Sequence, residues 1–130
     1  MATIKRFEDL EVWQKAREIC NTVSTYTQKY DFSRDFTLRD QIRSSSGSAM
    51  DNIAESFKRD GNREFIQFLS ISKGSIGEIR SQAYRAFDNK YISEEEFKIL
   101  KNECLILSDK LGAFINYLKQ SEIKGTKFKK

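Results

Sequence analysis

Basic side chains concentrate in the middle of this chain, at spacings that would align them on the faces of helices. Arg39 and Arg43 are four residues apart, and Lys73 and Arg80 are seven apart, so each pair would share one face. Rows of such cations suit the phosphates of a nucleic-acid backbone, which they bind in a salt-dependent and sequence-tolerant way. A third basic group stands where a turn is expected and consists of Lys58, Arg59 and Arg63.

Carboxylates are interleaved with these cations, which leaves a second interpretation open. A network of surface or interface ion pairs needs no ligand, and composition alone favours it. Lys58, Arg59 and Arg63 are the least compensated of the cations. The carboxylates concerned are Asp35, Asp40, Asp51, Glu55, Asp60, Glu64 and Glu78.

The chain contains no histidine. This excludes Ser-His-Asp and Cys-His catalysis, and it removes the commonest transition-metal ligand and the Glu-x-x-His repeat of di-iron bundles. The acidic run at residues 94–96 is explained by a helix N-terminus, and Glu55 and Glu64 lack an acid–base partner. A metal site made of carboxylates alone, or a Lys or Tyr base, stays open as an alternative, but no spacing points to one. We therefore expect no catalytic residue, no metal site and no cofactor, in a protein that is not an enzyme.

The formal net charge of +4 is concentrated at the C-terminal end. Residues 1–118 hold 18 basic and 18 acidic side chains, whereas residues 119–130 hold five lysines and only Glu122. Such a segment attracts polyanions loosely, and a solvated segment without a ligand is the alternative. We assign residues 1–120 to one domain and residues 121–130 to a basic C-terminal tail.

The sequence gives no sign of a membrane partner. No apolar run approaches the ~20 residues that a transmembrane helix needs, and the basic pair at residues 5–6 is not followed by the apolar stretch of a secretory signal. Cys20 and Cys104 both fall on apolar helix faces, which is typical of buried thiols in a reducing compartment. We expect a cytoplasmic protein.

Hydrophobic residues repeat at helical spacing through most of the chain. Helices are predicted at about residues 7–30, 37–57, 63–88 and 93–120, with turns between them that suit antiparallel neighbours. The predicted fold is therefore all-α, an antiparallel up-down-up-down four-helix bundle. The last helix has the clearest seam, with steps of three and four that alternate along Phe97, Leu100, Cys104, Leu107, Leu111, Phe114 and Leu118.

The first predicted helix carries two adjacent apolar stripes. One consists of Trp13, Ala16, Cys20, Val23, Thr27 and Tyr30, and the other of Val12, Ile19 and Tyr26. Two stripes are typical of a helix that faces both its own core and a partner subunit, so Val12, Ile19 and Tyr26 are candidates for an oligomer interface. A single wide core face is the alternative.

Small residues interrupt the second and third predicted helices. The stretch from Ser44 to Ala49 could be a flexible linker, but the flanking segments keep the same helical phase and favour a continuous helix. Gly74 and Gly77 lie in the middle of the third helix. We expect these glycines to face the serine-rich stretch and to allow an unusually close helix crossing.

Several segments together resemble the bacterial four helix bundle protein family, also called the 23S rRNA intervening-sequence protein family. The resemblance covers roughly residues 7–118, which is nearly the whole predicted domain. The segments that carry it are FEDLEVWQKA at 7–16, LRDQIR at 38–43, DNIAESF at 51–57, REFIQFL at 63–69, KGS at 73–75, Glu78, and Tyr91-Ile92.

The resemblance implies a ring-shaped homopentamer. The accessory protein of diversity-generating retroelements has a similar architecture and associates with reverse transcriptase and nucleic acid. The partners implied for this chain are rRNA or another structured nucleic acid, a reverse transcriptase, or a ribosomal component; a protein-interaction scaffold without nucleic-acid contact is the alternative. By this analogy the nucleic-acid-binding candidates are Arg39, Arg43, Lys58, Arg59, Arg63 and Lys73.

Overall fold

The computed structural model describes the backbone of residues 4–128 and the side chains of residues 4–121. The described part is all helical, which confirms the predicted all-α class. A short 3-10 helix, η1, comes first, and five α-helices follow. Their bounds are Phe7–Asp9 for η1, Glu11–Thr27 for α1, Tyr30–Arg34 for α2, Phe36–Phe57 for α3, Asn62–Asp88 for α4 and Glu94–Phe128 for α5.

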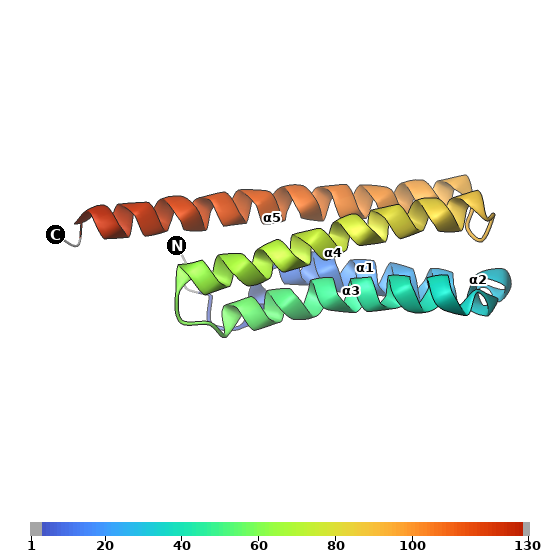
Figure 1. The fold of residues 1–130 in the computed structure, drawn as a ribbon, viewed down its shortest axis with the longest axis horizontal. Helices are drawn as coiled ribbons and strands as arrows, with labels where there is room; N and C mark the ends of the chain where they lie inside the picture. The colour runs from blue at the N-terminus through green and yellow to red at the C-terminus, as the bar shows by residue number, and fades with distance from the viewer. Residues whose placement is uncertain (1–3, 129–130) are drawn as a thin grey trace.

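The four long helices α1, α3, α4 and α5 lie side by side along one axis (Figure 1). Each one runs opposite to the long helix before it. α3 packs against α1 and α4, and α5 packs against α4 and α1, so the contacts enclose a common core. Side chains from all four helices fill this core, among them Ile19, Ile53, Ile76 and Leu107, each at most 1% exposed.

The N-terminal region is more divided than the predicted helix at 7–30. η1 ends at Asp9, α1 begins at Glu11 after an extended Leu10, and the segment predicted as a loop forms the short helix α2. Phe32 holds α2 in place, because its side chain is 1% exposed and stacks on Tyr91 with 5.4 Å between ring centroids. The turn between α1 and α3 is thus anchored in the core.

The serine-rich stretch continues α3 without a break, as its phase predicted. Its small side chains lie against α4, where the Ser72 hydroxyl donates to the carbonyl of Ala49 at 2.7 Å. The hydroxyls of Ser48 and Ser75 are 3.0 Å apart. Serines therefore contribute to the contact between α3 and α4, where they also satisfy backbone or hydroxyl groups.

Gly74 and Gly77 do not take part in that crossing, contrary to the prediction. Both are exposed, and no atom of another element lies within 4 Å of the place where a Cβ would stand. The helical periodicity explains the error, because Ser72, Ser75 and Ile79 occupy the inner face of α4 and leave these glycines on the outside.

Helix α5 begins with the capping box at Ser93 and Glu96. The Glu96 N–H donates to the Ser93 hydroxyl at 3.1 Å, and the Ser93 N–H donates to the Glu96 carboxylate at 2.8 Å. The predicted seam is buried, except that Ile115 replaces the partly exposed Phe114 at one step. Within the described residues, no helix is both long and apolar enough to cross a membrane.

The end of α5 differs from the predicted domain boundary. The helix continues past residue 120 to Phe128, and it projects beyond the ends of its neighbours (Figure 1). Much of the predicted tail at 121–130 therefore has a helical backbone. The side chains of residues 122–130, which include four of the five lysines, lie outside the described residues.

Candidate nucleic-acid interface

The six predicted cations do not form one surface. Arg39 and Arg43 lie near the start of α3, whereas Lys58 and Arg59 follow its end. At 1.5 Å per residue, Arg39 and Lys58 are separated by roughly 28 Å along the helix. Lys73 lies on a different helix, on the side that faces α5. The structure therefore divides the prediction into three local sites.

The first site, at the start of α3, is engaged in contacts within the subunit. The Arg39 Nε is 2.9 Å from an Asp40 carboxylate oxygen, and its guanidinium lies 4.9 Å from the centroid of Phe36. The Arg43 Nε donates to the Thr27 hydroxyl at 2.8 Å. Because Thr27 is fully buried, this bond ties α3 to the end of α1. Both arginines therefore have structural partners.

The second site, at the turn between α3 and α4, is also compensated in part. Arg59 forms an ion pair with Glu55, and its guanidinium lies 4.7 Å from the centroid of Phe68. The prediction that Arg59 is poorly compensated is wrong, because Glu55 is one helical turn earlier and within reach. Lys58 and Arg63 are exposed.

The third site is a groove of about 460 Å³ between α4 and α5. Lys73 enters it from α4, and Lys119 enters it from α5. The Lys73 Nζ would be 3.4 Å from a Cβ at Gly112, so the glycine leaves room for the ammonium group to lie across α5. The described residues that line this groove include no Asp or Glu; they are Ser70, Lys73, Gly74, Gly112, Ile115, Asn116 and Lys119.

The antiparallel packing of α4 and α5 sets the register of this groove. Near the start of α4, the Asn62 amide donates to the Leu118 carbonyl at 3.2 Å. Near the end of α4, the Tyr84 ring packs edge-on against Phe97 at 4.7 Å, and the Lys101 Nζ lies 5.5 Å from the Tyr84 centroid. Lys101 is therefore a further cation between α4 and α5, toward the end of α4.

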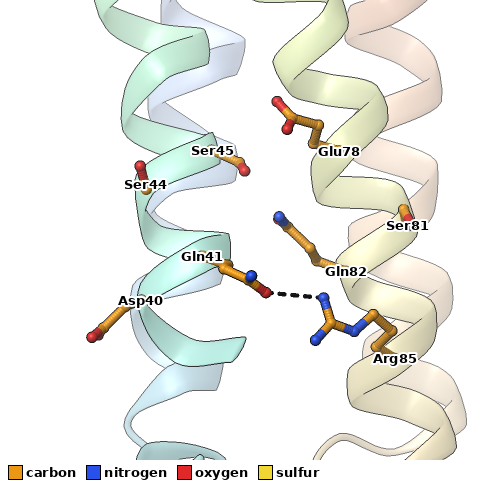
Figure 2. A pocket seen from close by; sticks show the side chains of 8 residues that line it. All are labelled: Asp40, Gln41, Ser44, Ser45, Glu78, Ser81, Gln82 and Arg85. Carbon is orange, nitrogen blue, oxygen red and sulfur yellow. Dashed lines mark hydrogen bonds between the residues drawn. The ribbon is translucent and has the colours of Figure 1, made fainter. Parts of the chain in front are cut away.

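A second groove, of about 560 Å³, lies between α3 and α4. Figure 2 shows side chains from both helices reaching into it, with the Arg85 guanidinium donating to the Gln41 amide oxygen at 2.9 Å. Gln82 comes from α4, and its Oε1 is buried without a hydrogen-bond partner among the described residues. The lining carries both signs of charge and is otherwise hydroxyl and amide: Asp40, Gln41, Ser44, Ser45, Glu78, Ser81, Gln82 and Arg85.

This α3–α4 groove was not predicted from the sequence. Its glutamines and serines have no distinctive spacing, so only the phase of α3 against α4 could have brought them together. Because Asp40 and Glu78 oppose Arg85, the groove lacks the single sign of charge that favours a polyanion. Among the described residues there is also no cluster of three Cys, Asp or Glu side chains that could hold a metal ion.

The predicted oligomer interface requires a correction. Val12, Ile19 and Tyr26 are 6%, 1% and 7% exposed, and they belong to the core of the single subunit. The Tyr26 hydroxyl donates to the Glu96 carbonyl at 3.0 Å, and burial raises the pKa of Tyr26 to about 12. Apart from Tyr30, which lies in α2 and is 71% exposed, the two stripes therefore form one wide core face, which was the alternative interpretation.

An exposed apolar stripe occurs instead on α5. Ile99, Ile106 and Tyr117 are 48%, 40% and 56% exposed, and Ala113 lies between the last two. Ile99, Ile106 and Ala113 repeat every seven residues, so they share one face of the helix. We call these four residues the α5 stripe. The sequence pattern does not reveal this stripe, because the stronger core seam runs through the same helix.

The amino-acid sequence matches the family described as 23S rRNA-intervening sequence protein over residues 8–113. This chain belongs to that family. The match confirms the resemblance that its segments suggested. Comparison with curated proteins gives no significant match.

A solved structure is similar to this member of the 23S rRNA-intervening sequence family. It is a protein with unknown function from the S23 ribosomal protein family of Bacteroides thetaiotaomicron. The two chains are 23% identical, with a TM-score of 0.74, and the similarity covers 80% of this chain and 97% of that one. At this identity the likeness supports the fold alone.

Proposed function

We propose that this protein is a homo-oligomeric, non-enzymatic, antiparallel four-helix bundle that binds RNA through a basic surface. The observation that carries the proposal is the groove between α4 and α5, where Lys73 and Lys119 converge and no described lining residue is acidic. Family membership supports RNA from the ribosomal large subunit as the first ligand to test. The resemblance stated above also implies five subunits.

A gel-shift series with structured 23S rRNA fragments at rising salt tests the binding. We expect binding at low salt that weakens steeply as salt increases, because lysine contacts to phosphates release counterions. A tRNA of similar length is the control for binding that does not depend on how the RNA is folded. The absence of binding at low salt, or binding that is indifferent to salt, would refute the proposal.

A protein-interaction scaffold is the second candidate function, and the α5 stripe favours it. Exposed isoleucines at a seven-residue repeat are typical of a helix that packs against another helix. That helix could belong to a second copy of the chain or to a different protein, such as a reverse transcriptase or a ribosomal component. The two functions predict different effects of the same substitutions, because the stripe and the lysine groove share no residues.

A further inference from the structure

We propose that the groove between α4 and α5 holds a single unpaired RNA strand, with its phosphates beside Lys73 and Lys119 and its backbone close to helix glycines. This inference rests on the proposed function and specifies the part of the RNA that is bound. The ammonium groups of Lys73 and Lys119 border the groove, together with Gly74 and Gly112.

The cations continue along the groove in both directions from Lys73. Arg63 lies seven residues before Ser70, which places it on the groove side of α4 near Lys119 of the antiparallel α5. At the opposite end, Lys101 lies beside Tyr84, whose side chain is 43% exposed. A cationic track with an aromatic side chain is typical of proteins that bind unpaired strands with little sequence preference.

The glycines explain how a strand could come close. Gly74 and Gly77 lie in the interior of α4, where glycine destabilises a helix relative to alanine. Neither has an atom of another element near its Cβ position, so packing within the subunit gives no reason for them. Gly74 lines the groove, where its missing side chain lowers the wall beside Lys73, and Gly77 lies one turn further along α4, about 40° around the helix from Lys73.

The size of the groove favours an unpaired strand over a duplex. It has a volume of about 460 Å³ and lies between two packed helices, whose axes are typically about 8–10 Å apart. A nucleic-acid duplex is wider than this spacing, so we expect its phosphates to contact only the rim of the groove. We expect the phosphates of an unpaired strand to approach Lys73 more closely.

Fluorescence anisotropy with a labelled unpaired oligoribonucleotide and with its duplex form tests the proposal on the full chain. Glycine-to-glutamine changes block the groove without changing charge, so the test variant is Gly74→Gln/Gly77→Gln. Gly47→Gln on α3 is the matched control, because Gly47 is also in a helix and also has open space at its Cβ. Thermal unfolding is measured for each variant.

We expect the groove variant to unfold at a higher temperature than the wild type and to bind the unpaired strand at least tenfold more weakly. The control should gain thermal stability and keep its affinity. Opposite changes in stability and affinity separate a blocked site from a misfolded protein. Unchanged affinity in the groove variant, or tighter binding of the duplex than of the unpaired strand by the wild type, overturns the inference.

The charge contribution is tested with Lys73→Gln/Lys119→Gln, and Lys15→Gln/Lys29→Gln, in and just after α1, is the matched double control away from the groove. For single strands the slope of log K against log salt falls by ~0.7 for each lost phosphate contact, so a fall of about 1.4 is expected only for the groove pair. If the wild type binds RNA and the two double variants have the same salt slope, the groove is not the binding site, although the protein still binds RNA. A wild type that binds neither structured nor unpaired RNA overturns both proposals.

Discussion

Glu103 shows how a single ionisable residue limits the stability of this fold. Its side chain is half-buried between α5 and α1, where one carboxylate oxygen accepts a hydrogen bond from the Thr22 hydroxyl at 3.2 Å. The other oxygen is buried without a partner among the described residues. Burial, reinforced by the nearby Glu18, raises the pKa of Glu103 above its ordinary value.

Glu103→Gln is expected to raise the melting temperature at pH 7. The unfolded chain releases the Glu103 proton at a lower pH than the folded protein does, so the folded state loses stability as pH rises through the raised pKa. Glutamine removes this penalty, and the difference from the wild type should shrink toward pH 4. Calorimetric scans from pH 4 to pH 8 measure it. A difference that does not change with pH would contradict the explanation.

At this scale the sequence predicted types of residue better than their partners. Lys73 is recognisable because its spacing from Arg80 marks a shared face. Lys119 counts only as one cation of the basic C-terminal segment, since only the α4–α5 register places it in the same groove as Lys73. Arg43 stays a candidate for nucleic-acid binding, but its hydrogen bond to Thr27, 16 residues earlier in the chain, was not predictable from spacing. Periodicity within one helix cannot supply contacts between helices.

At the scale of elements, the turn between α4 and α5 stores strain that a substitution can remove. Lys90 has a φ of 64°, in the left-handed region that favours glycine, and the Tyr91 N–H returns to the Ala86 carbonyl at 2.9 Å. Lys90→Gly is therefore expected to stabilise the protein by about 1 kcal/mol. Denaturant unfolding measures this change, with Lys98→Gly, inside α5, as a control that should destabilise. A loss of stability in Lys90→Gly would refute the interpretation.

Element boundaries were predictable where local chemistry defines them. The capping box at Ser93 fixed the start of α5, and the constant phase across the serine-rich stretch kept α3 continuous. α2 was missed because a five-residue helix carries too few positions for a periodic signal, and its order depends on Phe32 packing against Tyr91. The outward position of Gly74 and Gly77 likewise depends on tertiary contacts that local spacing leaves open.

At the scale of the whole molecule, two isoleucine substitutions distinguish assembly from folding. Ile106→Glu changes the exposed α5 stripe and should reduce the mass of the assembly while helical content is retained. Ile19→Glu buries a charge at a core position that is 1% exposed, so it should unfold the subunit itself. Light scattering combined with circular dichroism reads both effects. An Ile106→Glu protein with the wild-type mass would exclude the stripe from the interface.

The side-by-side packing of α1 and α5 has a consequence for biosynthesis. The first and last long helices complete the core together, so α1 keeps an uncovered apolar face until α5 has emerged from the ribosome. A nascent chain that has emerged only through α4 exposes the surface that α5 will cover. Translation products truncated before α5 should therefore be substrates for chaperones and proteases.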